Sequence, residues 1–493
     1  MGKLHKRRKG YSDEELDEDE LEEEMQEDED EEEIGEDEDE EEIDEDEDEE
    51  EIDEVEEEDE DERRADRHRR RVRNQVIAYL VIFFIFAGIA VGAVAVGRKV
   101  ASSVSQKRQE AELEKELEEA TKQEENNEEM VIETPETMEQ EPEEDFLGEL
   151  AVSYYSEMPI EDKVAGLFVV TPESVTGVTT ATQAGNGTQE ALNEYAVGGL
   201  IYFGQNIIDR EQITKMLANT TSMSNYPIFL AVDEEGGDVA RVANSSIEVT
   251  KVDDMATIGA AGDVSQAFAA GETIGSYLNE IGFNVNFAPV ADVTQEGTES
   301  ALGNRAFGSD PQAVGEMVSN VVSGIEGMGV SACLKHFPGL GSASDDTHEG
   351  RVEIDKTMEE LRETDFVPFS IGIGNGVDFV MVSHATVAAI DEELPSSLSK
   401  KVITDTLRGE LGFEGIVITD ALDMTSITEY YTSEEAAVLA IEAGADMLLM
   451  PEDFEAAYNA VLAAVQDGTI SEERIDESLD RIYRVKCAGK LEG

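Results

Sequence analysis

The sequence predicts an α/β protein whose main domain is a (β/α)8 TIM-type barrel. Short apolar runs recur eight times after residue 146, and each is too short to be a helix. Helical patterns separate most of these runs. Polar residues suited to acid and base chemistry stand directly after the runs, and the carboxyl ends of barrel strands form one common rim. These three observations favour a barrel with a functional site at that rim.

The eight apolar runs are the predicted buried parallel strands, at 163–170, 199–203, 228–232, 285–290, 330–334, 379–382, 415–418 and 447–450. A helix is predicted at 434–443, because Thr432 and Glu435 form a capping box. A last helix has apolar residues on one face and is expected to close the barrel, with Ile475, Leu479, Ile482 and Val485 on that face. A doubly wound open sheet is the alternative. It requires a glycine-rich phosphate loop after the first strand, whereas Thr-Pro-Glu-Ser follows Val170.

The segment 335–350 after the fifth strand has the densest set of chemical groups. We expect a loop to begin at His336, because Pro338 and the glycines that follow stop the strand. Asp346 and His348 stand two positions apart in this loop, so the carboxylate can orient and charge the imidazole. An ordinary polar loop with a surface histidine is the simpler interpretation. A metal site is a third, but its residues lack helical histidine spacing and a further ligand set; they are Asp345, Asp346, His348 and Glu349.

Polar residues also follow the other predicted strands. Asp233 to Gly237 follows the third strand, Asp292 the fourth, His384 the sixth and Asp420 the seventh. The three histidines of this domain all stand at or just after a strand end. Structural histidines would be scattered over helices and the opposite rim, so this placement favours a functional rim.

The first 62 residues are predicted to be a disordered polyacidic tail. The chain of 493 residues has a net charge of −81, and 41 of the residues from Asp13 to Glu62 are Asp or Glu. Such a segment cannot bury enough apolar surface to fold. Its charge disfavours nucleic acid as a partner, and its own partner is unknown. The remaining chain is apolar enough for a large core.

A membrane anchor is predicted next. An arginine-rich segment at 63–75 precedes an uncharged run of 21 residues at 76–96, which is long enough to span a bilayer as a helix. The arginines predict a cytoplasmic N-terminus and an extracytoplasmic main domain. A cleaved signal peptide is the alternative, but about seventy residues precede the apolar run. A stalk and linker at 97–145 then lead to the barrel domain at 146–493.

Several ordered motifs stand in this domain, namely Lys335 to Gly339, Asp346-Thr347-His348, Asp233 to Gly237 with Arg241 after it, and Gly415 to Leu422. Together they resemble glycoside hydrolase family 3. More narrowly they resemble the exo-β-N-acetylglucosaminidase branch. The resemblance implies that Asp420 is the nucleophile and that His348 is the general acid/base, with Asp346 as its partner. It also implies a set of sugar-holding residues, namely Asp233, Arg241, Arg305, Lys335 and His336; His384 is added from its place at a strand end.

These residue types suit a retaining glycosidase. Such an enzyme needs a carboxylate that attacks the anomeric carbon and a group that first donates a proton and later activates water. Asp420 fits the first role, and its neighbour Asp423 is interpreted as a loop or helix-start carboxylate. Leu340 and Asp238 depart from the family pattern, but neither replaces a residue of bond cleavage.

The sequence therefore predicts a membrane-anchored exo-hydrolase, without cofactor or metal, that removes terminal β-linked N-acetylglucosamine from peptidoglycan-derived or related glycans. The alternatives are β-glucosidase or β-xylosidase specificity, transfer to phosphate instead of water, and a non-catalytic wall-binding protein.

Overall fold

Eight parallel strands form a closed barrel. The computed structural model describes residues 145–295, 300–343, 347 and 350–491. The barrel strands are β1 (Phe168–Val170), β2 (Gly199–Tyr202), β3 (Phe229–Val232), β6 (Val285–Asn286), β7 (Ser331–Phe337), β9 (Phe379–Val382), β11 (Ile416–Thr419) and β12 (Leu448–Leu449). Their order is β11-β9-β7-β6-β3-β2-β1-β12. A parallel bridge between Ile418 and Met447 joins the two end strands. This closure confirms the predicted (β/α)8 fold and excludes the open sheet.

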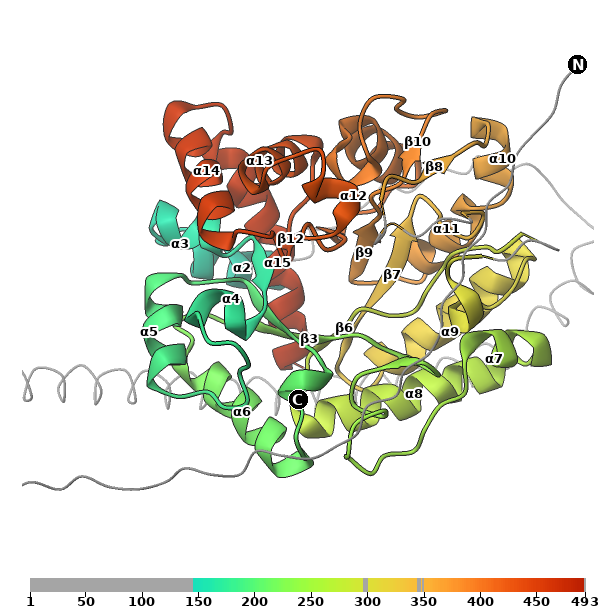
Figure 1. Cartoon of the computed structure of the whole chain (residues 1–493), viewed down its shortest axis with the longest axis horizontal. Coiled ribbons are helices and arrows are strands. Elements are labelled where there is room, and N and C mark those ends of the chain that lie inside the picture. The colour runs from blue at the N-terminus through green and yellow to red at the C-terminus, as the bar shows by residue number, and fades with distance from the viewer. Residues whose placement is uncertain (1–144, 296–299, 344–346, 348–349, 492–493) are drawn as a thin grey trace, which may run out of the picture. The chain divides into compact units, whose positions relative to one another are not determined.

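Helices follow the strands in the chain and surround them (Figure 1). They are α2 (Phe146–Tyr155), α3 (Ile160–Ala165), α4 (Pro172–Thr176), α5 (Asn186–Glu194), α6 (Arg210–Met223), α7 (Met255–Ala261), α8 (Val264–Ile281), α9 (Pro311–Glu326), α10 (Met358–Glu363), α11 (Phe366–Gly374), α12 (Thr425–Thr428), α13 (Ser433–Ala443), α14 (Phe454–Asp467) and α15 (Glu472–Leu491). Lys401–Glu410 is a π-helix, and short 3-10 turns occur at Gly204–Asn206, Gly303–Arg305 and Ser396–Leu398. Two small strand pairs lie outside the barrel: antiparallel β4 (Glu234–Gly236) with β5 (Val239–Ala240), and parallel β8 (Glu353–Ile354) with β10 (Thr386–Val387).

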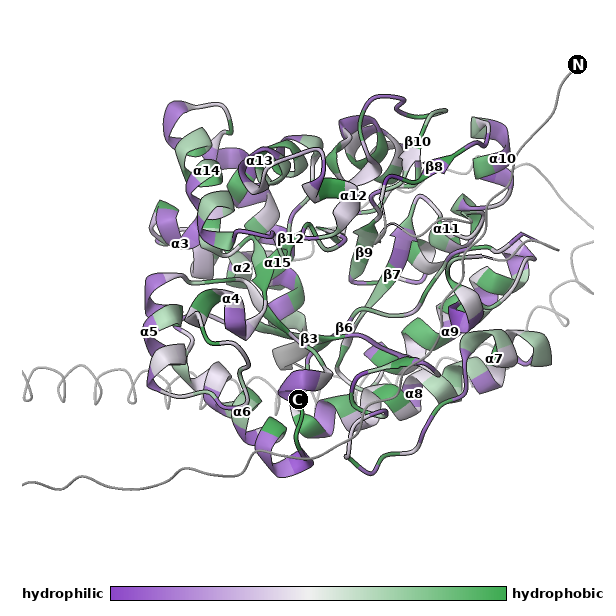
Figure 2. Ribbon diagram, in the orientation of Figure 1, coloured by the Kyte–Doolittle hydropathy of each residue, from purple (hydrophilic) through white to green (hydrophobic). Residues whose placement is uncertain are grey.

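The core consists of the barrel strands and the inner faces of the helices. Apolar side chains of the strands are buried throughout, whereas the helices have polar outer faces (Figure 2). The capping box of Thr432 and Glu435 opens α13, as predicted. The predicted apolar face of α15 is buried at Ile475, Leu479 and Ile482. Burial of this apolar area is the main stabilising contribution to the barrel.

Three predicted strand boundaries were wrong. The first predicted strand began at Lys163, but residues 160–165 form α3, where the Lys163 ammonium is buried against Glu472 and Asp476 of α15 at 2.9 and 2.6 Å. The fourth strand is shorter than predicted and ends at Asn286. The fifth strand is longer, because the carbonyl of Lys335 accepts a hydrogen bond from the Ala291 amide and that of Phe337 accepts one from the Ser383 amide. His336 therefore lies in β7 and not in a loop.

The predicted tail (1–62), arginine-rich segment (63–75), membrane span (76–96) and linker fall outside the described residues, apart from Asp145 at the linker's end. In the part of the chain that the structure describes, no helix combines the length and apolar character needed to cross a bilayer.

Candidate active site

A cavity of about 390 Å3 lies at the carboxyl ends of the barrel strands. Six of the predicted site residues line it, namely Asp233, Arg241, Arg305, Lys335, His336 and Asp420. They come from segments far apart in the sequence, after β3, before α9, and at the ends of β7 and β11. The barrel brings them together because parallel strands end at one rim.

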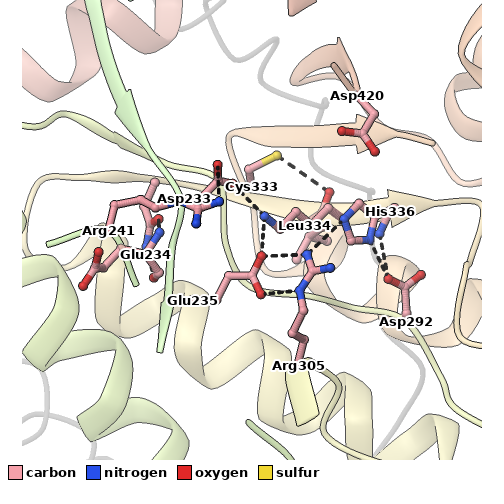
Figure 3. Close-up of polar contacts among 12 residues, drawn as sticks. Asp233, Glu234, Glu235, Arg241, Asp292, Arg305, Cys333, Leu334, His336 and Asp420 are labelled. Atoms are coloured by element: carbon pink, nitrogen blue, oxygen red, sulfur yellow. Dashed lines mark hydrogen bonds and ion pairs between the residues drawn. The ribbon is translucent and has the colours of Figure 1, made fainter. Parts of the chain in front are cut away.

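Charged side chains alternate in sign along one wall of this cavity (Figure 3). The Lys335 ammonium lies 2.9 Å from Asp233 Oδ1 and 2.6 Å from Glu235 Oε1. Arg305 donates from Nε and Nη2 to the two oxygens of Glu235, both at 2.8 Å. Glu235 thus accepts hydrogen bonds from two cations, and the arginine binds it in the bidentate geometry of a strong ion pair.

These ion pairs keep the wall ionised despite its burial. Burial by itself raises the pKa of Glu235, but Lys335 and Arg305 outweigh that effect and lower the pKa to about 2. Burial likewise opposes the charge of Lys335, yet Asp233 and Glu235 hold the pKa of the ammonium above its ordinary value. The wall therefore offers fixed charges to the hydroxyl groups of a ligand.

Arg241 occupies the end of this wall beside Phe203. Its guanidinium lies 5.6 Å from the centre of the Phe203 ring and 4.0 Å from Asp233. Arg241 Nε is buried and, among the described residues, has no hydrogen-bond partner. A buried donor without a partner is costly, so this N–H is suited to bind a ligand oxygen.

The buried carboxylate of Glu234 fixes the turn that bears Arg241. It accepts hydrogen bonds from the amides of Val242 and Ala243 at 2.7 and 2.8 Å and from the Tyr277 hydroxyl at 2.7 Å. Gly236, at a φ of 99°, permits the tight reversal between β4 and β5. Glu234 therefore has a structural role, although it is part of the same acidic motif as Asp233 and Glu235.

Asp292 holds His336 at the floor of the cavity. Its Oδ2 accepts hydrogen bonds from the His336 backbone at 3.1 Å and from ring Nδ1 at 2.8 Å, and its Oδ1 accepts one from the Leu340 amide at 2.6 Å. Because a carboxylate oxygen can only accept, Nδ1 carries a proton and donates to Asp292, and Nε2 lies 3.4 Å from Arg305 Nη2. Asp292 thereby fixes both the histidine and the start of the following loop.

Asp420 faces His336 from the end of β11 (Figure 3). Its amide donates to the Val382 carbonyl of β9 at 2.8 Å, and its Oδ1 accepts from the Ala421 amide at 2.8 Å. Burial would raise its pKa, but His336, His384, the Ala421 amide and Lys335 together hold the pKa below the ordinary value. Asp420 is thus ionised at neutral pH and oriented by the backbone. Asp423 lies in the following turn, as predicted, and also lines the cavity.

His384, for which the sequence predicts contact with sugar, is not among the described residues that line the cavity. The residue is 1% exposed. Its Nδ1 lies 2.7 Å from the Ser397 hydroxyl, and its Nε2 lies 2.8 Å from the Ala421 carbonyl, to which it donates. The imidazole is therefore enclosed by the protein and supports the turn after Asp420.

Asp346 and His348 lie outside the described residues, but Thr347 between them is described. Thr347 is buried and lines the same cavity as Asp420. Its carbonyl accepts a hydrogen bond from the Ser426 amide of α12 at 3.4 Å. The four residues of the alternative metal site also fall outside the described part of the chain. Within that part, no group of three or more potential metal-ligating side chains occurs.

Two site residues were missed by sequence reasoning, Glu235 and Asp292. Both stand in the strand-end segments that the sequence singles out, so their position was a usable signal. Their partners were not predictable, because each pairs with a side chain from another segment more than forty residues away.

The fold and the cavity together define a barrel enzyme whose site lies at the carboxyl ends of its strands. The chain belongs to glycosyl hydrolase family 3, since the family's N-terminal domain model matches residues 159–485.

Named relatives agree with this assignment. A beta-hexosaminidase of Stenotrophomonas maltophilia is 35% identical over 276 residues, which cover 55% of this chain and 81% of that protein. Beta-hexosaminidase A of Pseudoalteromonas piscicida is 32% identical over 328 residues, so that 60% of this chain spans about half (54%) of the relative. The solved family 3 beta-N-acetylglucosaminidase from Paenibacillus sp. FPU-7 matches with a TM-score of 0.64 and 36% identity, over 68% of this chain and 64% of that one.

Proposed function

We propose that this protein is a membrane-anchored retaining exo-glycosidase that hydrolyses terminal β-linked N-acetylglucosamine. The position of Asp420 carries the proposal, because an ionised carboxylate with fixed orientation lies across a cavity from a wall of hydroxyl-binding charges. The names of the relatives support the sugar, since they are hexosaminidases and an N-acetylglucosaminidase.

The proposed reaction is a double displacement. An Asp420 oxygen attacks the anomeric carbon, the bond from that carbon to the departing oxygen breaks, and this oxygen takes a proton from His348. Water then attacks the glycosyl ester and gives its proton back to His348, which frees Asp420. The placement of Thr347 on the cavity wall supports a role for its neighbours Asp346 and His348.

Sugar binding is proposed for the charged wall. Asp233 accepts hydrogen bonds from hydroxyls, and Arg241 and Lys335 donate to hydroxyl oxygens. Arg305 and His336 complete the wall, whereas His384 is proposed to position Asp420 from behind.

Water is favoured over phosphate as the acceptor. Lys335 and Arg305 each contact a carboxylate within 3 Å, and Arg241 lies 4.0 Å from Asp233, which Lys335 also contacts. A phosphate group in this cavity would meet three cations that already share two carboxylates, together with the negative charge of Asp420.

The direct test compares nitrophenyl β-glycosides of N-acetylglucosamine, glucose and xylose with the full-length protein, with and without inorganic phosphate. We expect fastest release from N-acetylglucosaminide, free sugar as the product, and loss of roughly 1000-fold or more in Asp420→Asn. Asp423→Asn is the matched comparison, because its carboxylate lines the same cavity. A slow fluorosugar substrate should label Asp420 in the Asp423 variant. Faster cleavage of glucoside, a sugar phosphate product, or label on Asp423 would overturn the corresponding part of the proposal.

The anchor and the natural substrate are proposals from the sequence pattern. Peptidoglycan-derived fragments are proposed because the barrel domain is expected outside the membrane. Cell fractionation should leave the full-length protein in the membrane after alkaline carbonate extraction, and deletion of 76–96 should release it. Purified muropeptides should yield free N-acetylglucosamine. Cleavage of chitin oligosaccharides but not of muropeptides would contradict peptidoglycan fragments as the substrate.

A further inference from the structure

Met450, directly after β12, has an unusual backbone conformation. Its φ is 46°, and among the residues that the structure describes it is the one non-glycine residue with positive φ. Hydrogen bonds hold this conformation from both sides. The Met450 amide donates to the Val169 carbonyl at 2.8 Å, and the Leu449 carbonyl accepts from the Leu422 amide at 2.9 Å. A side chain kept in a sparsely populated conformation is a reason to look for function, and Met450 lines the cavity.

Met450 belongs to an apolar wall that faces the charged wall. This apolar wall consists of Ile201 and Phe203 at the end of β2, Met424 after β11, and Leu449 and Met450 at the end of β12. The charged wall arises from segments after β3 and at the end of β7, and each of these strands is three strands away from β12 around the closed barrel. Phe203, at the end of β2, meets the charged wall beside Arg241. Asp420 stands between the two walls directly after β11, the strand next to β12.

The two walls impose an orientation on a bound hexosamine. With its anomeric carbon at Asp420 and its hydroxyls at the charged wall, the sugar turns its remaining substituents to the apolar wall. The substituent on C2 is one bond from the anomeric carbon and so must lie close to Asp420. A hydroxyl group is not stabilised by contact with thioether and aliphatic groups. The methyl of an acetamido group is stabilised by such contact, because it is removed from water.

We propose that Met450 is a specificity-determining residue that receives the acyl methyl of the C2 acetamido group. This inference rests on the proposed function and names the residue that selects the C2 substituent. The constrained backbone fixes the direction in which the methionine side chain leaves the main chain. Met424 contributes the neighbouring surface.

The test compares four variants of the full-length protein on three nitrophenyl β-glycosides that differ only at C2, with an acetamido, a propionamido or a hydroxyl group. Met450→Gly relieves the positive φ while removing the side chain, so added backbone strain cannot explain its result. Met450→Ala repeats the truncation, Met450→Leu restores apolar volume, and Met328→Ala removes a methionine at the opposite end of the barrel, next to the start of β7.

We expect Met450→Gly and Met450→Ala to lower kcat/KM for the acetamido sugar by roughly 10-fold. The propionamido sugar should lose less, because its extra methylene fills the space left by the methionine. The hydroxyl sugar should change by no more than about 2-fold. Met450→Leu and Met328→Ala should retain the wild-type ratios.

Equal losses on all three substrates in Met450→Gly, or an unchanged ratio of acetamido to propionamido activity, would overturn the assignment of Met450. Wild-type protein that does not prefer the acetamido sugar over the hydroxyl sugar would instead overturn the proposed function, so the two failures are distinguishable.

Discussion

Asp292 accepts two hydrogen bonds from His336, one from its amide and one from its imidazole, and so fixes the ring from below. The same carboxylate also accepts a bond from the Leu340 amide. Three N–H groups therefore donate to the buried carboxylate of Asp292. A side chain that replaces Asp292 must accept hydrogen bonds from all three.

Asp292→Asn tests this convergence. Asparagine offers one acceptor oxygen and an amide that donates, so at least one buried N–H would be left without a partner. We expect the free energy of unfolding to fall by about 1–3 kcal/mol. Urea denaturation measures the loss, and kcat on the N-acetylglucosaminide should fall with it because His336 becomes free to rotate. Wild-type stability in this variant would show that Asp292 does not hold the floor of the cavity.

Glu235→Gln should make the free energy of unfolding depend less on pH in the acid range. The folded pKa of Glu235 is about 2, below the ordinary 4.5. Folding therefore favours the ionised form, and this stabilisation is present above pH 4.5 and is lost as pH falls toward 2. Between about pH 5 and pH 3 the wild-type free energy of unfolding should fall by about 2 kcal/mol more than that of Glu235→Gln. Glu248→Gln, at an exposed position, should behave like wild type. Parallel curves for Glu235→Gln and wild type would contradict the expectation.

Glu326 should make the protein less stable as pH rises, which is the opposite of the effect of Glu235. It ends α9, and its Oε1 accepts a hydrogen bond from the Asp378 amide at 3.1 Å. Burial, aided by the charge of Asp378, raises its pKa to about 8. Because the folded state holds this proton more tightly than the unfolded state, the free energy of unfolding falls as pH rises from about 4.5 to about 8.

Glu326→Gln keeps the acceptor and removes the titration. We expect its stability to decline less than that of wild type between about pH 5 and pH 8 in urea denaturation. Glu316→Gln, on the exposed side of the same helix, serves as the control. If the free energy of unfolding of Glu326→Gln falls as much as that of wild type over this pH range, Glu326 does not cause the pH dependence.

His384→Gln distinguishes a positioning residue from a sugar-binding one. Since His384 contacts Ser397 and the Ala421 carbonyl, its loss should misplace Asp420 and lower kcat by roughly 10-fold. KM should stay near the wild-type value, because His384 is not among the residues that line the cavity. Steady-state kinetics separate the two parameters. A large rise in KM with unchanged kcat would instead support the sugar contact that the sequence predicts for His384.

His348→Ala should affect substrates according to their leaving groups. A nitrophenolate departs without protonation, whereas a sugar alkoxide needs a proton donor. We expect a much larger loss of kcat/KM on a disaccharide than on a nitrophenyl glycoside, and Asp346→Asn should show the same trend more weakly. Equal losses on both substrates would remove His348 from the role of general acid.

Local sequence patterns predicted much of the fold. Buried parallel strands must be apolar on both faces, so all eight appeared as short apolar runs, and the capping box at Thr432 located the start of α13. The errors occurred where tertiary contacts override local preference. Lys163 is held in a helix by two carboxylates of α15, and β7 continues to Phe337 because neighbouring strand ends supply its hydrogen-bond partners.

The sequence by itself determined the barrel, the family and the side chains that stand at strand ends, because these follow from periodicity and from residues near one another in the chain. Only the tertiary structure decided what each of those side chains does. It paired Glu235 with Lys335 and Arg305, placed Asp292 under His336, enclosed His384 behind Asp420 and turned Met450 toward the cavity. Such pairings depend on which strands become neighbours when the barrel closes, and the spacing of residues along one strand does not contain that information.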